Sequence, residues 1–499
     1  MTPLALLSLL AFAAPGDTTL VINAVVVDGT GAPARRASVR IADGRILAVG
    51  ALQRLPGDRL VDARGMVLAP GFIDTHSHFD DSLLVRLDAL PAVSQGITTI
   101  VVGQDGDQPY PLADFFGRLK ATPAAVNVAA YAGHGTIRTD VLKDDFRRAA
   151  SASEVAMMRQ RLERELAAGA LGLSTGLEYD PGIYSAPDEV LALARVAAAT
   201  RGRYISHVRS EDRRFYSAVT ELLTIGREAR LPVQMSHAKL AMRSLWGSAP
   251  KLLERLDSAR KAGIDVTLDV YPYTYWQSTI TVLFPGRNFA DSAEAELVLA
   301  EVAAADGIRI THAADRSIAG RTIAEIARAA GEAPVLTLMR LAQRGDSTER
   351  AGDDYIGIIG TSMAEEDIAT LLAWPHANVC SDGGTDGGHP RGWGAFPRVL
   401  GRYVRERKVL TLEDAVRKMT SLSAAHVGLP DRGTIAPGKR ADLVLFDPKT
   451  VADRSTPAAP TAPPAGIVRV WTNGVEVYRD GKPTGARPGA VLRRADIRG

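Results

Sequence analysis

The 499-residue sequence contains a single cysteine, Cys380, and no apolar stretch long enough to cross a membrane. One cysteine excludes an internal disulfide and any zinc site built from cysteines. The 59 basic and 57 acidic residues leave a net charge of only +2, without the basic excess that nucleic-acid-binding proteins carry. We therefore expect neither nucleic acid nor membrane as a partner, and the nine histidines become the informative residues.

The sequence begins MTPLALLSLLAFAAPGD, with an apolar run at residues 4–14. This run is too short to span a bilayer. It resembles the hydrophobic part of a secretory signal, with small residues near Ala14, although the usual preceding positive charges are missing. We predict a signal peptide over residues 1–16 and a periplasmic or secreted protein; without such a signal the protein would be cytoplasmic.

Alternating, β-branched segments separated by Gly, Pro and Asp turns lie near both ends of the chain. They predict one small β-sandwich made of residues 17–68 and 428–499. Between them, residues 69–427 alternate buried apolar strands with amphipathic helices, and eight strand candidates can be found. This pattern predicts an α/β fold, a (β/α)8 TIM-type barrel, with an insertion at about residues 285–350 that does not fit one βα step.

The stretch GFIDTHSHFD ends the first barrel strand with two histidines one residue apart. Side chains at i and i+2 of a strand point to the same side, so His76 and His78 would project together. Two neighbouring imidazoles suit a metal ion. A surface turn that merely contains two histidines is the alternative.

The other predicted strands repeat this placement. The active site of such a barrel lies at the C-terminal ends of its strands. Seven of the eight ends carry a possible ligand or proton-transfer group: His76 and His78, Gln104 and Asp105, His134, Glu178, His207, His237, and Asp382.

These residue types predict a hydrolytic metal centre. Zinc takes imidazole and carboxylate ligands, and catalytic zinc lowers the pKa of its water to about 7. His76, His78, His207, His237 and Asp382 would hold one or two Zn²⁺ ions. Either Glu178 or Asp105 could bridge two ions, and we favour Glu178 because it follows a continuous buried strand. Alternatively, Asp105 is a turn residue and Glu178 holds the outer N–H of a histidine.

The sequence resembles the amidohydrolase superfamily and, within it, the N-acyl-D-amino-acid deacylases (D-aminoacylases). The resemblance covers nearly the whole chain. It rests on PGFIDTHSHFD, GALGLSTGLEYDPG, SHVRSE, SHAKL, DVYPYT, HPRGWGAFPRVLGRYVRE and GTIAPGKRADLVLFDPKTVAD. The HxH pair marks only the superfamily, whereas HPRGWGAFPRVLGRYVRE is far more specific.

The resemblance implies metal-dependent hydrolysis of the amide bond of an N-acylated, D-configured amino acid by a metal-bound hydroxide. His76, His78, His207 and His237 match the metal ligands of the family, and Asp382 matches its catalytic general base and acid. The family pattern further implies that the substrate carboxylate is held by Lys239, Tyr273, Ser278 and Arg391. The alternatives are solvated loop charges for Lys239 and Arg391, barrel packing for Tyr273, and a turn hydroxyl for Ser278.

One position departs from the family pattern. Known members have a cysteine metal ligand in a GNCG-like turn after the second strand, whereas this chain has GQDG, with Asp105 in place of the thiolate. A carboxylate is a harder ligand than a thiolate. A dipeptidase or a cyclic-amide hydrolase on the same scaffold therefore stays an alternative. Heterocycle deamination is a less favoured alternative. A non-enzymatic binding role is also less favoured, because the ligands and the acid after strand eight are all present.

Overall fold

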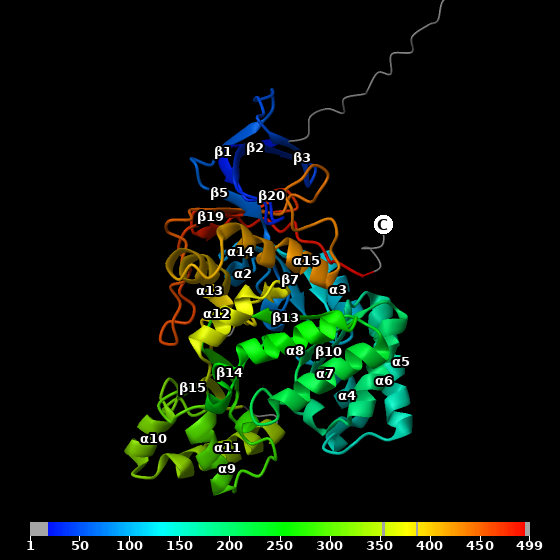
Figure 1. The fold of residues 1–499 in the computed structure, drawn as a ribbon, viewed down its shortest axis with the longest axis vertical. Coiled ribbons are helices and arrows are strands. Elements are labelled where there is room, and N and C mark those ends of the chain that lie inside the picture. Colours follow the sequence, from blue (N-terminus) through cyan, green and yellow to red (C-terminus); the bar gives the residue numbers. More distant parts are fainter. Residues whose placement is uncertain (1–17, 352–354, 386–387, 495–499) are drawn as a thin grey trace, which may run out of the picture.

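The computed structural model describes residues 18–351, 355–385 and 388–494, without the side chains of residues 348–351. The predicted signal peptide lies outside the described residues. Three parts follow one another along the long axis: a sheet of terminal strands, a central barrel and a smaller inserted unit (Figure 1). The predicted combination of a (β/α)8 barrel with a β-domain made from both termini is confirmed.

The barrel consists of eight parallel strands, with β8 and β9 counted as one interrupted strand. One continuous sheet runs from β9 to β17 and a second from β6 to β8. The backbone N–H of Asp382, after β17, donates to the carbonyl of His76, after β6, at 2.8 Å, and this bond links the last barrel strand to the first. The strands are β6 (Phe72–Asp74), β7 (Ile97–Val102), β8 (Asn127–Ala130) with β9 (Ala132–Gly133), β10 (Gly172–Gly176), β11 (Arg203–His207), β12 (Val233–Met235), β13 (Val266–Val270) and β17 (Ala377–Val379).

Helices follow the strands and cover the outside of the barrel (Figure 1). Local sequence sets their ends: Ser151 and Glu154 form a capping box at the start of α5, and Gly169 ends it in a left-handed conformation. The helices are α1 (Asp80–Leu83), α2 (Leu90–Val93), α3 (Leu112–Ala121), α4 (His134–Leu142), α5 (Ala152–Ala168), α6 (Pro187–Ala199), α7 (Phe215–Ala229), α8 (Ala249–Lys261), α12 (Glu365–Ala373), α13 (Arg391–Arg398), α14 (Leu412–Met419) and α15 (Ser421–Val427).

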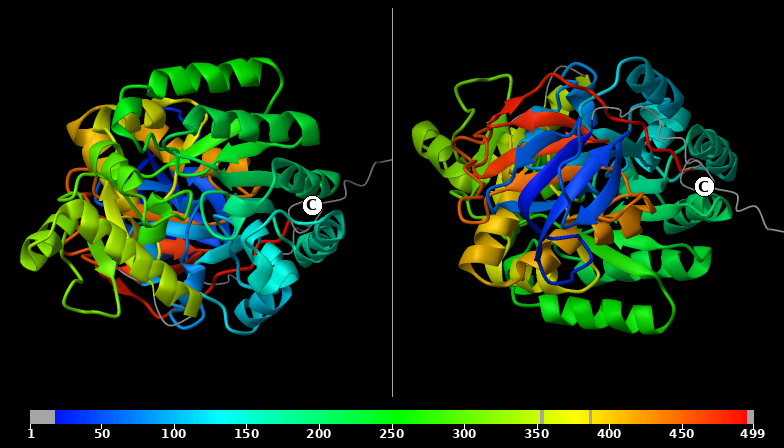
Figure 2. Two further views of the ribbon diagram at one scale, coloured as in Figure 1. Left: turned by 90° about the horizontal axis from the view of Figure 1, so that it is seen from below. Right: turned by 90° about the horizontal axis from the view of Figure 1, so that it is seen from above.

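The terminal strands form one mixed sheet, in which strands from the two ends of the chain lie side by side (Figure 2). Antiparallel pairing of β5 with β18 joins the N-terminal strands to the C-terminal ones. The strands are β1 (Thr19–Val26), β2 (Arg35–Ala42), β3 (Arg45–Gly50), β4 (Arg59–Asp62), β5 (Val67–Pro70), β18 (Leu443–Phe446), β19 (Ile467–Thr472), β20 (Val475–Arg479) and β21 (Lys482–Pro483).

The inserted unit lies at the far end of the molecule from this sheet (Figure 1). It has an antiparallel sheet of β14 (Tyr275–Thr279), β15 (Ile308–His312) and β16 (Gly357–Thr361), with helices α9 (Ser292–Leu297), α10 (Ile323–Ala330) and α11 (Pro334–Ala351). A hydrophobic cluster of its own holds it together. The sheet extends beyond both limits of the predicted insertion, because β14 and β16 pair with each other directly beside the barrel.

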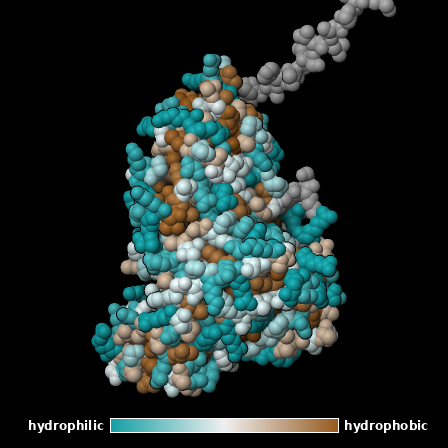
Figure 3. Space-filling view, in the orientation of Figure 1, coloured by the Kyte–Doolittle hydropathy of each residue, from teal (hydrophilic) through white to brown (hydrophobic). Residues whose placement is uncertain are grey.

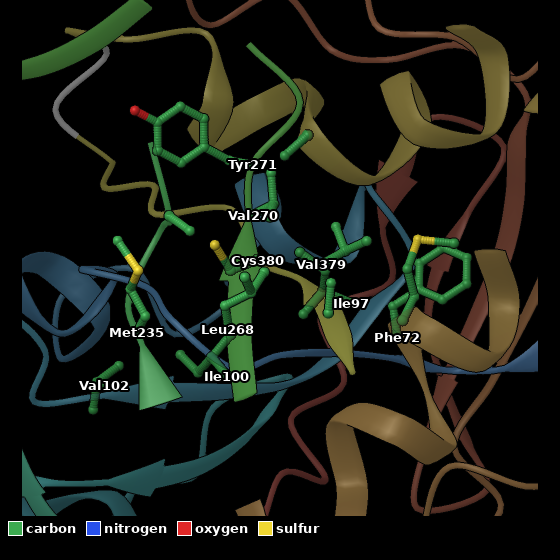
Figure 4. Packing of buried hydrophobic residues seen from close by; sticks show 14 of the residues in the cluster. Phe72, Ile97, Ile100, Val102, Met235, Leu268, Val270, Tyr271, Val379 and Cys380 are labelled. Atoms are coloured by element: carbon green, nitrogen blue, oxygen red, sulfur yellow. The ribbon is translucent and has the colours of Figure 1, made fainter. Parts of the chain in front are cut away.

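Side chains such as Ile97, Leu268 and Val379 belong to the large hydrophobic cluster in which the barrel strands pack against the surrounding helices (Figure 4). Cys380 is buried here, and its thiol donates to Asp269 at 3.2 Å. None of the helices in the described residues is long and apolar enough to cross a membrane. On the face drawn in Figure 3, polar and apolar residues are interspersed.

Candidate metal centre

Six of the predicted metal ligands meet at the C-terminal mouth of the barrel. Three residues there, Asp105, His237 and Asp382, have positive φ angles of 51°, 30° and 51°. Such angles are uncommon for residues other than glycine and often mark functional sites. Each of the three follows the end of a strand, where the sharp turn directs its side chain towards the others.

The first cluster surrounds the HxH pair. His76 Nε2 lies 3.4 Å from Asp105 Oδ1 and 3.6 Å from Asp382 Oδ1. His78 Nε2 lies 3.5 Å from Asp105 Oδ2 and 3.3 Å from Asp382 Oδ1. Two imidazoles and two carboxylates therefore converge on one point.

The second cluster shares Asp105 with the first. Asp105 Oδ2 lies 3.2 Å from His237 Nε2, and His207 Nδ1 lies 3.1 Å from the same nitrogen. Asp105 thus faces both sets of histidines, a position suited to a ligand shared by two ions.

Several buried polar atoms of the first cluster have no hydrogen-bond partner within the described part of the chain: both ring nitrogens of His76, Asp105 Oδ1 and Asp382 Oδ1. Buried polar atoms in native proteins are nearly always paired, so this group of donors and acceptors needs an additional ligand. A cation between them would satisfy the carboxylates and imidazoles together, and the donor set fits zinc.

The electrostatics agree with a cation site. Burial raises the pKa of Asp105, but the neighbouring His76 and His237 outweigh it and hold that pKa well below its usual value. Burial also raises the pKa of Asp382, and Arg391 and His237 reverse the shift. Burial lowers the pKa of His207 to about 3. The carboxylates are therefore ionised and His207 is neutral, as metal ligands require. Burial lowers the pKa of His78 and His237, but Asp105 and Asp382 outweigh it and raise the pKa of His78 well above its usual value and that of His237 to about 10, so a metal would displace a proton from these two rings.

Glu178 was favoured from sequence as the bridging ligand, but the geometry favours Asp105. Glu178 Oε2 lies 2.9 Å from His207 Nε2, the ring nitrogen opposite to the one that faces Asp105 and His237. It belongs to a third group of potential ligands with His207 and Glu211. Glu178 extends from the strand end towards the outer side of His207, whereas the turn at Asp105 carries its carboxylate between the histidines.

Lys239 and Arg391, expected to bind the substrate carboxylate, both line the cavity above the centre. Each is already paired with an acid: Lys239 Nζ lies 2.7 Å from Glu211 Oε1, and Arg391 Nη1 lies 2.6 Å from Asp382 Oδ2. Sequence reasoning did not single out Glu211, although it stands four residues after His207 within SHVRSE.

The predicted role of Tyr273 does not agree with its position. Its hydroxyl donates to Asp453 at 3.2 Å, and the residue is absent from the cavity wall. Tyr271 instead lies against both cations, with its ring centroid 4.9 Å from the Arg391 guanidinium and 5.7 Å from Lys239 Nζ. The Tyr271 hydroxyl is buried without a partner among the described residues, and Tyr271 does not line the cavity either, so its contact with the site runs through the two cations.

Other strand-end residues have different positions. Ser278 lies on β14 and lines the cavity, as does Gln104. His134 is outside the centre, because its Nε2 is paired with Glu189 at 2.8 Å. The cavity has a volume of about 740 Å³, and residues of the inserted unit such as Trp276 form the wall opposite the barrel.

Comparison with known proteins agrees with this architecture. A family model described as "Amidohydrolase family" matches residues 59–478. The N-acyl-D-glutamate deacylase of Alcaligenes xylosoxydans xylosoxydans is 41% identical over 94% of this chain and 95% of its own length.

Two solved structures are similar throughout. The N-acyl-D-glutamate deacylase of Bordetella bronchiseptica, complexed with zinc and a phosphonate mimic of the tetrahedral intermediate, has a TM-score of 0.84 and 37% identity. The match covers 95% of this chain and 99% of that one. A D-aminoacylase with a binuclear metal centre has a TM-score of 0.84 and 35% identity, covering 96% and 100%.

Proposed function

Because this chain belongs to the amidohydrolase family, in the branch of the N-acyl-D-amino-acid deacylases, we propose that it hydrolyses the amide bond of an N-acyl-D-amino acid. The observation that carries the proposal is the double cluster of four histidines and two aspartates beside two cations, Lys239 and Arg391. The first part supports amide hydrolysis and the second supports recognition of a carboxylate.

Zinc is the metal that this proposal assigns to the centre. His76, His78 and Asp382 would hold one ion and His207 and His237 a second, with Asp105 shared between them. When bound, zinc supplies a Lewis acid for the amide carbonyl and lowers the pKa of water. The first cluster alone provides enough ligands for a centre with a single ion.

Asp382 is the proposed general base and acid. It accepts a proton from the attacking water at Oδ1, the oxygen that faces the histidines, and delivers the proton to the amide nitrogen as the carbon–nitrogen bond breaks. Its Oδ2 stays on Arg391, which fixes the orientation of the carboxylate. The products are a free D-amino acid and the carboxylate of the acyl group.

The carboxylate of the substrate is bound in this proposal by Arg391, Lys239 and Ser278. The planar guanidinium of Arg391 offers paired donors for a carboxylate: its Nη1 lies against Asp382, and its Nε has no partner among the described residues. Tyr271 supports both cations through its ring face.

The test is release of free amine by the purified, zinc-supplemented protein from matched N-acetyl-D- and N-acetyl-L-amino acids with acidic, apolar and thioether side chains. Dipeptides and hydantoins complete the panel, and the Asp382→Asn variant measures contaminating activity. We expect release from the D-series alone. Release from dipeptides or cyclic amides alone would overturn the proposal in favour of those substrates, and equal release from both enantiomers would overturn the stereochemistry.

A further inference from the structure

We propose that Glu211 is a positioning residue that holds the metal ligand His237 and the carboxylate-binding Lys239 in one arrangement. This inference rests on the proposed function for the role of Lys239, but not for the contact with His237. Glu211 lies on the loop between β11 and α7, four residues after His207, and its side chain is buried.

Glu211 contacts both partners through short distances. Its Oε1 lies 3.1 Å from His237 Nδ1 and 2.7 Å from Lys239 Nζ. Its Oε2 lies 2.8 Å from the same ammonium. The main chain also links the loop of Glu211 to the loop of His237 and Lys239, since the N–H of Ala241 donates to the Glu211 carbonyl at 3.0 Å.

The chemistry of the imidazole decides which atom donates in the contact between His237 and Glu211. His237 Nε2 faces Asp105 and His207, so it is the nitrogen available to a metal. A neutral imidazole that offers one nitrogen to a metal carries its proton on the other, so His237 Nδ1 is then a donor. Lysine has no acceptor. Lys239 Nζ lies 2.7 Å from Nδ1 and can only donate to it, so without a metal Nδ1 is the acceptor of that bond. When Nε2 binds a metal and the proton moves to Nδ1, the Glu211 carboxylate at 3.1 Å is the group beside Nδ1 that can accept it.

Glu178 provides an internal comparison. It has the same relationship to the other histidine of the second cluster, at 2.9 Å from His207 Nε2. In the described part of the chain, no hydrogen bond or ion pair joins its carboxylate to Lys239. Both glutamates therefore orient a histidine, but Glu211 alone also fixes the cation that faces the substrate.

Two consequences follow from the double contact. Without Glu211, His237 loses the acceptor that sets its tautomer and ring orientation, which weakens metal binding. Lys239, a long and flexible side chain, also loses the anion that holds it and is repelled by a neighbouring dication, so the substrate carboxylate is bound less well.

The experiment compares three full-length variants, Glu211→Gln, Glu178→Gln and Lys239→Met, with the wild type. Zinc affinity is measured by competition with a chromophoric chelator, without substrate. KM and kcat are then measured at saturating zinc for the best N-acyl-D-amino acid of the panel. Far-UV circular dichroism and thermal unfolding establish that each variant is folded.

We expect Glu211→Gln and Glu178→Gln to weaken zinc binding by about 10-fold to 100-fold. We expect Glu211→Gln and Lys239→Met to raise KM by about tenfold. Only Glu211→Gln should both weaken zinc binding and raise KM: Lys239 Nζ also lies 2.7 Å from His237 Nδ1, but removing this cation lowers its repulsion of the metal and should not weaken zinc binding. Unchanged zinc affinity in Glu211→Gln, or a KM increase of the same size in Glu178→Gln, would overturn the inference.

If Glu211→Gln does not fold, Glu211→Asp takes its place. It keeps the charge but shortens the reach, and smaller losses in the same two quantities are expected, whereas wild-type values in both would overturn the inference. If the substrate panel shows no activity, the proposed function fails, whereas the zinc measurement still decides whether Glu211 orients His237.

Discussion

Arg391 Nη1 lies 2.6 Å from one oxygen of the Asp382 carboxylate, Oδ2. The other, Oδ1, faces the Nε2 atoms of His76 and His78 at 3.6 and 3.3 Å. Arg391 therefore holds Oδ2 of Asp382, and Oδ1 is the oxygen that faces the histidines and would transfer the proton. The same arginine is positioned to meet the substrate carboxylate, so binding and proton transfer depend on adjacent groups.

Asp382→Asn should lower kcat by about 10²-fold to 10⁴-fold, because an amide cannot take and return a proton as the carboxylate does. The histidines and Asp105 remain, so at least one zinc equivalent should stay bound. Asp453→Asn is a matched control. Asp453 pairs with Arg398 at a distance of 3.1 Å, and it does not line the cavity. Turnover at the wild-type rate in Asp382→Asn would contradict the assigned role.

Tyr271→Leu and Tyr273→Phe should have opposite effects on KM. Tyr271→Leu removes the ring face that lies against Arg391 and Lys239, so it should raise KM. The Tyr273 hydroxyl bonds to Asp453, so Tyr273→Phe should cost about 1 kcal/mol of stability and leave KM unchanged. Thermal unfolding and steady-state kinetics on both variants measure this. The reverse pattern would restore Tyr273 as the substrate-binding tyrosine.

The barrel and the convergence of the candidate metal ligands could be predicted from sequence because both depend on local pattern. Apolar strands end in His76, His207, His237 and Asp382, and parallel strands in a barrel bring their C-terminal ends to one mouth. No long-range detail is needed for that inference. The shared ligand was less predictable, because Asp105 reaches both clusters only through the left-handed turn at its own backbone.

The two tyrosines show where pattern fails. Strand alternation places Tyr271 and Tyr273 on the same side, but β13 ends at Val270 and the N–H of Tyr273 bonds to the carbonyl of Tyr271 at 3.1 Å. This tight turn around Pro272 sends the second tyrosine away from the first. Glu211 was missed for a related reason: its importance lies in contacts with His237 and Lys239, which follow it by 26 and 28 residues.

Stability should depend on pH through Lys418, which is buried and donates to the carbonyls of Trp374 and Ala377. Burial lowers its pKa to about 8. In the unfolded chain the pKa is about 10.4, so between pH 8 and that value the unfolded state binds more protons and stability rises with pH. Below pH 8 both states are protonated and the cost of burying the charge is fully present.

Lys418→Met should therefore improve the melting temperature, relative to wild type, more at pH 7 than at pH 10. Thermal unfolding with excess chelator measures this without changes in metal binding. Lys482→Met, on the exposed strand β21, is the control and should show no such difference between the two pH values. An equal effect of Lys418→Met at both would exclude the buried charge as the cause.

Asp105→Ala should remove at least one zinc equivalent, because Asp105 is the residue common to the two clusters. Metal content after gel filtration measures the loss, and the increase in melting temperature on adding zinc should shrink with it. Asp107→Ala, on the same loop but bonded to Thr136, is the control and should keep its zinc.

Asp105→Cys should bind zinc again and discriminate more strongly against manganese, since a thiolate is a softer ligand than a carboxylate. Full zinc content in Asp105→Ala would exclude Asp105 as a ligand and return Glu178 to that role.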